Sequence, residues 1–397
     1  MTNKKKKLNI LFITDVIPHN KNEYRGKYIL DQISAVNKVV CGSMCLLLIT
    51  PFFKKHKFIT GLDHSISANL KHLKILSFPR YYFMRLRSFI FILLNFRLIN
   101  NIIKERKINI IHCHNYSLSG LAYHLSKLFN VPYYITIHGR EDPSVIENTK
   151  RKIKNIRLFL NEAEKVVSVG DVLKKYLKNF DVADNQIKVI PNGISYDWII
   201  RKENRINIGS KNKNYKNLIS VSELRIEKGI NYTIKALYEL KNKFNIILNY
   251  NIVGDGPEIK ILKNMAHKLN IENQIKFLGS KNNLEVLKEL DKNDIFILPS
   301  WFESFGIAHA EAMARGLIVI GCRGEGNEAF ITNEKTGFLI KKHSSNAITD
   351  ILLKILDNKY NLKEIEGNAV KVIKNNFTWE QSAGKLISLY NEAVYEE

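Results

Sequence analysis

The sequence predicts an α/β protein made of two doubly wound lobes, each with a parallel sheet covered by helices. Two observations predict this fold class. Apolar runs rich in β-branched residues alternate with amphipathic helical stretches, and the alternation occurs twice, before and after a polar segment at residues 201–216. A length of 397 residues with 45% hydrophobic content is sufficient for two sizeable cores. The polar segment is dense in Lys, Arg and Asn, which is typical of an interlobe linker with an exposed loop.

Strands of the first lobe are expected where short apolar runs recur between helical patterns. These runs are residues 8–14, 39–48, 108–112, 133–136, 165–169 and 188–190. Because parallel strands need long crossovers that are usually helices, this spacing favours a parallel sheet with helices on both faces.

The second series begins with a strand at residues 218–221. The helix after it carries apolar residues at spacings of three and four, namely Ile230, Ile234, Leu237 and Leu240. Further strands are expected at residues 246–253, 275–278, 295–298 and 317–320. Near the end of the chain, Thr378-Trp-Glu-Gln381 has the form of a capping box, which predicts that a last helix begins there.

Composition argues against several protein classes. The cysteines show neither zinc-site nor disulfide spacing, which fits buried thiols in a reducing compartment: Cys41, Cys45, Cys113 and Cys322. No signal peptide is expected, since the lysines at positions 4–7 are followed only by a short strand-like run and Asp15. The longest continuous apolar run, residues 89–94, is far shorter than the roughly 20 residues that span a bilayer. We therefore expect a soluble or peripheral protein.

The net charge of +23 predicts anionic partners. Residues 80–97 mix aromatic, aliphatic and Arg side chains, and Lys104, Arg106 and Lys107 follow, as in helices that lie on membranes. A core helix with a solvated basic face, or a compositional bias towards Lys, Asn and Ile, is the alternative. A nucleic-acid-binding protein would also carry this charge, but the sequence shows no recognition motif or aromatic-and-basic array of that class.

The most informative segment is residues 294–316, which predicts an apolar strand, a kinked loop and an Ala-rich helix with two carboxylates. Gly306 opens the helix, so backbone amides converge where an anion can sit. Glu303 precedes the helix and Glu311 lies within it. If both were helical they would lie about 12 Å apart along the axis, roughly the reach from a hexose to the ribose of a nucleotide-sugar. Exposed Glu side chains on helices are usually only solvated. The spacing of Glu303 and Glu311 therefore indicates a function only together with the residues around them.

Those surroundings are Pro-Ser before Glu303, Ser-Phe-Gly after it, and Glu311-Ala-Met-Ala-Arg-Gly. The segment resembles the Glu-x7-Glu signature of the retaining GT-B glycosyltransferases, specifically glycosyltransferase family four and its capsule, O-antigen and teichuronic-acid type members. The resemblance runs from about residue 8 to residue 394. It implies two Rossmann-like lobes that face each other across a cleft, with a C-terminal helix crossing back to the first lobe. It also implies an acceptor-side domain at residues 1–195 with 378–397, and a nucleotide-sugar donor domain at residues 196–377.

In that family the first Glu contacts the donor sugar and the second binds the ribose hydroxyls, which the resemblance assigns to Glu303 and Glu311. The turn at residues 221–229 resembles the family's Gly-Arg-Leu-x-x-x-Lys-Gly, which assigns Lys228 to the diphosphate. The chain departs from the family at Glu223, which occupies the position of the family's Arg. Arg225, two residues further on, could reach the same phosphate oxygens, or the loop could be solvated surface. An inactive relative therefore stays open as an alternative.

The resemblance implies further donor contacts, each of which could instead be an ordinary turn or packing residue. Gly254 lies in Gly254-Asp-Gly-Pro after a predicted buried strand, and Leu278 lies at the end of the next strand. The loop Gly324-Glu-Gly326 resembles the family's loop on the phosphate side. The remaining donor-binding candidates surround the predicted helix start, and they are Ser304, Phe305, Gly306 and Ile307.

In the first lobe, His138 ends a predicted strand where the family places a His beside the donor sugar, although a lone His is often structural. The acceptor-side candidates are Gly26, His114, Asn115, Arg140 and Asn192. A metal site at His112-Cys-His114 is not favoured, because strand alternation directs both rings to one face without a third ligand nearby in sequence.

The function expected from this resemblance is retaining transfer of a sugar from a UDP- or GDP-linked donor to a glycan or lipid-linked saccharide, in bacterial surface polysaccharide synthesis. No metal or other cofactor is expected, since Lys228 and helix amides would replace a divalent ion. The expected location is cytoplasmic, peripheral at the inner face of the bacterial cytoplasmic membrane. The alternatives are a hydrolysing nucleotide-sugar epimerase and a basic nucleic-acid-binding protein.

Overall fold

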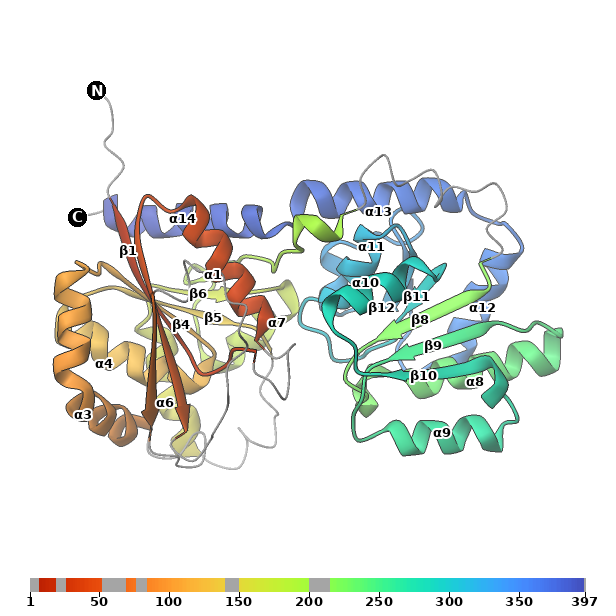
Figure 1. Cartoon of the computed structure of the whole chain (residues 1–397), viewed down its shortest axis with the longest axis horizontal. Helices are drawn as coiled ribbons and strands as arrows, with labels where there is room; N and C mark the ends of the chain where they lie inside the picture. The colour runs from red at the N-terminus through yellow and green to blue at the C-terminus, as the bar shows by residue number, and fades with distance from the viewer. Residues whose placement is uncertain are drawn as a thin grey trace, which may run out of the picture. The chain divides into compact units, whose positions relative to one another are not determined.

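The computed structural model describes residues 7–18, 26–51, 69–75, 84–139, 150–199 and 215–395, and divides the chain into two compact units (Figure 1). The first unit is Met1–Gly193 with Trp379–Glu397, and the second unit is Ile194–Thr378. Each unit contains one sheet in which all strands run parallel, so the predicted fold of two doubly wound lobes is confirmed. Arg140, Arg80 and most of the predicted linker lie outside the described residues.

The sheet of the first unit has the strand order β3-β2-β1-β4-β5-β6-β7. Its strands are β1 (Leu8–Thr14), β2 (Gly42–Pro51), β3 (Leu70–Ile75), β4 (Ile110–His114), β5 (Tyr133–Ile137), β6 (Lys165–Ser168) and β7 (Ile187–Val189). The sequence does not predict β3, because this edge strand is half exposed and carries lysines in place of an apolar run. Strand β2 begins three residues later than predicted, since the preceding helix continues through Val39.

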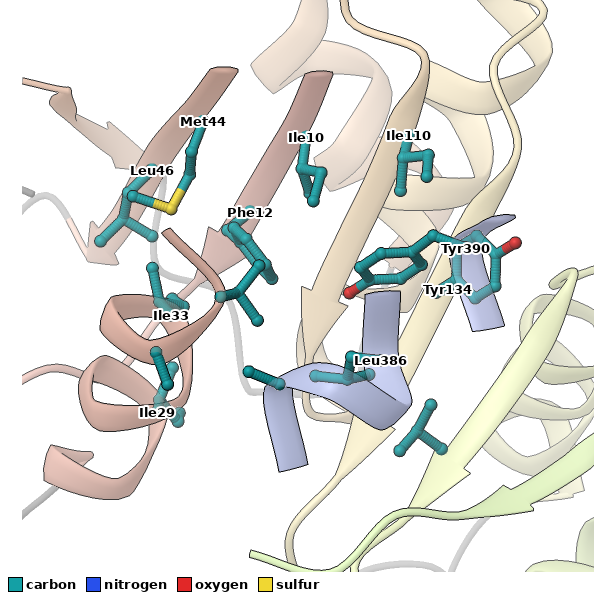
Figure 2. Packing of buried hydrophobic residues seen from close by; sticks show 14 of the residues in the cluster. Ile10, Phe12, Ile29, Ile33, Met44, Leu46, Ile110, Tyr134, Leu386 and Tyr390 are labelled. Atoms are coloured by element: carbon teal, nitrogen blue, oxygen red, sulfur yellow. The ribbon is translucent and has the colours of Figure 1, made fainter. Parts of the chain in front are cut away.

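Helices α1 (Lys27–Val39) and α14 (Trp379–Tyr395) pack against each other over this sheet. Figure 2 shows their side chains converging on strands β1, β2 and β4, and the labelled residues are Ile10, Phe12, Ile29, Ile33, Met44, Leu46, Ile110, Tyr134, Leu386 and Tyr390. The last helix therefore belongs to the first unit, as predicted. Helix α4 (Ser119–Phe129) contacts β4 and β5 and also packs against α3 (Met84–Glu105) and α6 (Lys150–Asn161). A short helix, α7 (Asp171–Leu177), follows β6.

The sheet of the second unit has the order β10-β9-β8-β11-β12-β13. Its strands are β8 (Asn217–Val221), β9 (Asn249–Val253), β10 (Ile275–Gly279), β11 (Ile295–Ile297), β12 (Ile318–Cys322) and β13 (Phe338–Ile340). Strand β13 was not among the strands predicted from the sequence, although its three residues are all apolar.

Helices cover both faces of this second sheet. They are α8 (Ile230–Phe244), α9 (Ile259–Lys268), α10 (Asn283–Asp291), α11 (Ile307–Ala314), α12 (Ser345–Leu356) and α13 (Leu362–Asn376). Helix α8 packs against α9 and α12, and α11 packs against α13. Figure 1 shows α8 and α9 on one side of the strands and α10 and α11 on the other.

Both sheets reverse their strand order beside their first strand. Strand β1 lies between β2 and β4, and β8 lies between β9 and β11. Loops that leave two neighbouring strands at such a switch point diverge to opposite faces, which leaves a crevice at the carboxyl ends of the strands where ligands bind. The loops after β1, β4, β8 and β11 are therefore the places to look for a functional site.

Helix α3 is long and apolar enough to cross a membrane by length and composition, with a mean hydropathy of 1.4 over its most apolar window. Of that window, 39% is buried inside the structure. Helix α3 packs along α4, and Met84, Phe91 and Ile99 are among its buried residues. Core helices of soluble proteins satisfy the same length and hydropathy test, so this single helix is weak evidence for a membrane span.

Replacing Gly254 by Ala is expected to lower the free energy of unfolding by roughly 2–4 kcal/mol. Gly254 follows β9 with a φ of +129°, and a Cβ atom there would lie 1.8 Å from the carbonyl oxygen of Ser222. Urea unfolding followed by circular dichroism measures the loss. Gly367→Ala is the control, because a Cβ at this helical position meets nothing within 4 Å and Ala should stabilise helix α13 by about 1 kcal/mol. Equal unfolding midpoints for the two variants would contradict this account.

Candidate active site

Two loops of the second unit bring opposite charges together at its switch point. Lys228 follows β8 and Glu303 follows β11, and Lys228 Nζ lies 2.9 Å from Glu303 Oε2. The Lys228 and Glu303 side chains are 20% and 17% exposed, so the pair is largely shielded and still retains contact with solvent. The structure thus joins two residues that the sequence assigned to the donor phosphates and the donor sugar, although they lie 75 positions apart.

The local sequence explains why Lys228 lies at this position. Leu224 is fully buried and anchors the loop, because its N–H donates to the Asp255 carbonyl at 2.9 Å. Gly229 has a φ of +70°, and a Cβ atom there would lie 2.3 Å from the Pro299 carbonyl oxygen. Only Gly lets the backbone after Lys228 approach the end of β11 this closely.

The ionisation of Glu303 is set by its surroundings. Burial opposes ionisation, but Lys228, the nearby His309 and the backbone N–H of Gly306 outweigh it and hold the pKa of Glu303 below its usual value. Burial lowers the pKa of His309 to about 4, and its Nε2–H donates to the Leu298 carbonyl at 3.1 Å. At neutral pH, Glu303 is therefore a carboxylate beside a neutral imidazole.

Helix α11 begins directly after this carboxylate. Gly306 adopts a left-handed conformation with a φ of +93° and makes no side-chain cap, and Ile307 is the first helical residue. Uncapped N–H groups at a helix start can bind an anion such as a phosphate. Ser304 is half-buried, whereas Phe305 is buried with its ring 5.2 Å from that of Phe330. Phe305 can therefore reach a ligand only through its backbone.

The other donor candidates lie along the same edge of the sheet. Glu311 is half-buried in the second turn of α11. Gly254 and Leu278 lie at the ends of the paired strands β9 and β10, and the Gly254 N–H donates to the Gly279 carbonyl at 2.8 Å. The structure shows where each of these residues lies, and their roles in donor binding stay predictions.

Arg225 pairs with Glu223, the residue that occupies the position of the family's Arg. Its Nη2 atom lies 3.0 Å from Glu223 Oε1, and the side chains of Arg225 and Glu223 are 52% and 58% exposed. A carboxylate paired with this guanidinium cancels much of the positive charge that the loop could direct at a phosphate. Lys228 is less exposed than Arg225 and lies beside Glu303 at the switch point.

Glu325 contacts Glu303 and is itself paired with Lys342, and the sequence does not predict either contact. Glu325 is 1% exposed, and its Oε2 accepts the Glu303 backbone N–H at 2.7 Å. Its Oε1 accepts a hydrogen bond from Lys342 Nζ at 2.5 Å. The resemblance of Gly324-Glu-Gly326 to a family loop placed this loop near the phosphates, but no spacing shows that its carboxylate turns inward.

Three histidines stack at the carboxyl ends of β4 and β5 in the first unit. Ring centroids are 5.0 Å apart for His112 and His114, and 5.2 Å apart for His114 and His138. His114 Nδ1 lies 2.9 Å from His138 Nε2. Strand alternation predicted that His112 and His114 share a face, and they do. Among the described residues, no group of three or more His, Cys, Asp or Glu side chains is arranged to hold a metal ion.

The three rings have different surroundings. His112 is fully buried, with Nε2 2.7 Å from Thr136 Oγ1 and Nδ1 hydrogen-bonded to the Tyr390 hydroxyl, so it links β4 to α14. His138 is half-buried, with its ring centroid 4.7 Å from that of Tyr28. Burial lowers the pKa of each of the three histidines, that of His114 to about 3. All three rings are therefore neutral at pH 7.

The acceptor-side candidates that the structure describes also lie near this edge of the first sheet. Asn115 follows β4 with a φ of +72°, and its N–H donates to the Thr136 carbonyl at 2.9 Å. Asn192 is buried with its side chain beside His138, and Gly26 precedes α1 with a φ of +80°. Asp15, which was not among the predicted site residues, accepts a hydrogen bond through Oδ2 from Ser117 Oγ at 2.6 Å across the switch point.

Acidification from pH 7 towards pH 5 is expected to destabilise the first unit. The pKa of His114 is about 3 in the folded chain, against an ordinary value of 6.5, because burial disfavours the charged ring. The stabilisation from a neutral ring is complete above pH 6.5 and is lost progressively as the pH falls towards 3. The unfolding free energy should therefore fall by up to ~1.4 kcal/mol per pH unit for each such histidine.

Urea unfolding at pH 7.5, 6.0 and 5.0 measures this dependence. His114→Gln should make the pH slope of the unfolding free energy shallower. His267→Gln removes a histidine whose side chain is 81% exposed and should leave the slope unchanged. Equal slopes in the two variants would contradict the burial argument.

Two parallel doubly wound units, with a Lys–Glu pair and an uncapped helix start at the switch point of the second, match what the resemblance to the GT-B class of glycosyltransferases implies. The family model described as Glycosyltransferase Family 4 matches residues 57–198, and the model described as Glycosyl transferases group 1 matches residues 201–392. The chain belongs to the GT-B glycosyltransferases of the family-four type.

Individual proteins are similar to most of the chain. The chain is 27% identical over 307 residues to the UDP-Gal:alpha-D-GlcNAc-diphosphoundecaprenol alpha-1,3-galactosyltransferase of Escherichia coli, covering 74% of this chain and 78% of the relative. A glycosyltransferase from Rickettsia africae has a TM-score of 0.76 at 20% identity and covers 99% of this chain and 100% of its own. Anabaena HepE, crystallised with UDP, has a TM-score of 0.74 at 18% identity, with coverages of 97% and 100%. These two structures share the fold.

Proposed function

We propose that this protein is a retaining, metal-independent glycosyltransferase that moves a sugar from a UDP- or GDP-linked donor to a hydroxyl of a glycan or lipid-linked saccharide. The Lys228–Glu303 pair at the switch point of the second unit carries the proposal. Relatives support the substrate classes. HepE was crystallised with UDP, and the E. coli relative is named for a UDP-sugar donor and a diphosphoundecaprenol-linked acceptor.

The residues of the second unit have distinct parts in this reaction. Negative charge grows on the departing diphosphate as the glycosidic bond breaks, and Lys228 together with the first N–H groups of α11 stabilises that charge. Glu303, held as a carboxylate, accepts hydrogen bonds from the donor sugar, and Glu311 accepts them from the ribose. In front-face transfer, the departing phosphate oxygen takes the proton of the incoming hydroxyl. Positioning and electrostatics then account for the rate.

The first unit contributes His138 beside the donor sugar, together with the acceptor-side residues, in this proposal. His138 is neutral and half-buried, so it can exchange a hydrogen bond with a substrate hydroxyl without adding charge. His114 Nδ1 lies 2.9 Å from His138 Nε2, and the Asn192 side chain lies beside the His138 ring. Asn115 and Gly26 border the same edge of the sheet.

A transfer assay on the full chain tests the proposal. Thermal-shift screening with UDP- and GDP-sugars identifies the donor, since a ligand of the folded form raises its melting temperature. Transfer to saccharide acceptors is then followed by chromatography, with EDTA expected to leave the rate unchanged. Release of a free sugar epimer without any acceptor would instead identify a hydrolysing epimerase. A strict need for Mg²⁺ or Mn²⁺ would overturn the metal-independent part.

The proposal includes an anionic membrane as the surface on which a lipid-linked acceptor is met, at the inner face of the bacterial cytoplasmic membrane. Helix α3 presents an exposed apolar stripe of Leu86, Phe89 and Leu93, with exposed fractions of 50%, 62% and 65%. Arg85 and Arg97 are exposed on the same helix, and the chain carries a net charge of +23. Apolar side chains flanked by basic ones suit insertion at an anionic interface, where each basic residue contributes about 1 kcal/mol.

Phe89→Glu/Leu93→Glu is expected to reduce binding to anionic liposomes at least tenfold, because both substitutions remove apolar contact and add negative charge. Flotation with phosphatidylcholine vesicles, with and without phosphatidylglycerol, measures the binding. Leu284→Glu is the matched control, since Leu284 is 73% exposed in the second unit. Indifference of the unmodified chain to lipid charge would contradict the membrane proposal and favour a soluble acceptor.

A further inference from the structure

Glu303 lies on a loop that needs support from elsewhere in the second unit. Residues 298–306 connect β11 to α11 without regular secondary structure. Lys228 contacts the Glu303 carboxylate, but a carboxylate keeps a fixed position only if its backbone is also fixed. The groups that bind the Glu303 peptide therefore decide where its side chain points.

Two consecutive residues after β12 bind that peptide on both sides. Glu325 Oε2 accepts the Glu303 N–H at 2.7 Å, and the Gly326 N–H donates to the Glu303 carbonyl at 2.9 Å. A Cβ atom on Gly326 would lie 2.2 Å from the Ser304 carbonyl oxygen, so only Gly permits this approach. Both backbone polar groups of Glu303 are thus paired with a single neighbouring loop.

Lys342 completes the arrangement from beyond β13. Glu325 is 1% exposed, and a buried carboxylate is unfavourable unless it is paired and hydrogen-bonded. Lys342 Nζ lies 2.5 Å from Glu325 Oε1, and the Lys342 side chain remains 33% exposed. Hydrogen bonds to an ionised acceptor are shorter and stronger than neutral ones, so the charge tightens the contact with Glu303.

We propose that Glu325, braced by Lys342, is a positioning residue of the transfer reaction. It fixes the Glu303 peptide so that the Glu303 carboxylate meets the donor sugar beside Lys228. The inference rests on the proposed function, because it takes Glu303 as the donor-sugar contact. A plain structural role for this loop would change stability and leave the turnover of the folded enzyme unaffected.

Three variants test the inference at a temperature where all remain folded. Glu325→Leu removes both hydrogen bonds, and kcat is expected to fall roughly 10- to 100-fold, since misplacement by about 1 Å can have an effect of this size. Glu325→Gln keeps an acceptor for the Glu303 N–H, so its loss should be smaller. Lys342→Met removes only the ion pair with Glu325 and should lower kcat several-fold. This variant tests the inference even if Glu325→Leu does not fold. Glu164→Leu, at an exposed position of the first unit, is the control.

The readouts separate positioning from stability. The Kd for UDP should stay within about twofold, because UDP carries no sugar for Glu303 to contact. Hydrogen exchange of the Glu303 amide should become faster in Glu325→Leu. Wild-type kcat in folded Glu325→Leu and Lys342→Met, or an unchanged exchange rate of that amide, overturns the inference. If the unmodified chain transfers no sugar, the proposed function fails by itself, and amide exchange still shows whether Glu325 holds the Glu303 peptide.

Discussion

Replacing Glu303 by Gln is expected to lower kcat at least 100-fold while leaving the fold intact. Gln has nearly the same volume and can still accept a hydrogen bond from Lys228, so the loop after β11 keeps its shape. The lost negative charge is the part that matters in the reaction, because a preorganised charged group facing the reacting sugar contributes factors of about 10²–10³. Turnover with the identified donor and acceptor, under saturating conditions, measures the effect.

UDP binding provides the internal control for Glu303→Gln. UDP lacks the donor sugar, and Lys228 remains to contact its phosphates, so the Kd for UDP should change little. Glu164→Gln makes the same chemical change at an exposed position of the first unit and should retain full activity. Unchanged turnover in Glu303→Gln would remove Glu303 from the reaction.

The main architecture could be predicted because it depends on local patterns. Apolar runs bounded by turns gave most strands of both sheets, and spacings of three and four gave α8. The pairing of Lys228 with Glu303 follows from topology, since the order of the second sheet places β8 beside β11. Two motifs at the carboxyl ends of neighbouring strands must therefore lie close together, even though each motif was identified separately in the sequence.

Features decided by tertiary contacts were outside the reach of the sequence. Strand β3 is half exposed and carries lysines, so it gives no clear apolar period. The inward orientation of Glu325 depends on Lys342, and no local pattern distinguishes this buried Glu from a solvated one. The pairing of Arg225 with Glu223 was not predicted, and the role of Arg225 as a phosphate contact stays a prediction. The sequence gives the charges of such residues, and packing decides which charges meet.

Replacing Lys228 by Met is expected to lower kcat/KM about 100-fold and, unlike Glu303→Gln, to weaken UDP binding roughly tenfold. Lys228 is the cation of its loop that lies beside Glu303 and is mostly shielded from solvent, whereas Arg225 and Glu223 form an exposed pair. Charge-assisted hydrogen bonds to a phosphate are strong, and they strengthen further as the leaving group gains charge. Titration calorimetry with UDP and steady-state kinetics measure the two effects, and Lys235→Met, an exposed change in α8, is the control.

The double variant Lys228→Met/Glu303→Gln shows whether the two residues act as one unit. Each single change leaves a partly buried partner without its counter-charge, whereas the double variant removes both charges. The double variant should therefore be more stable than the sum of the single changes predicts, by about 1–3 kcal/mol. The kcat of the double variant should be only slightly lower than that of the less active single variant, since loss of either charge already disables the Lys228–Glu303 pair. Strict additivity in both stability and kcat would mean that Lys228 and Glu303 act independently, despite the 2.9 Å contact between them.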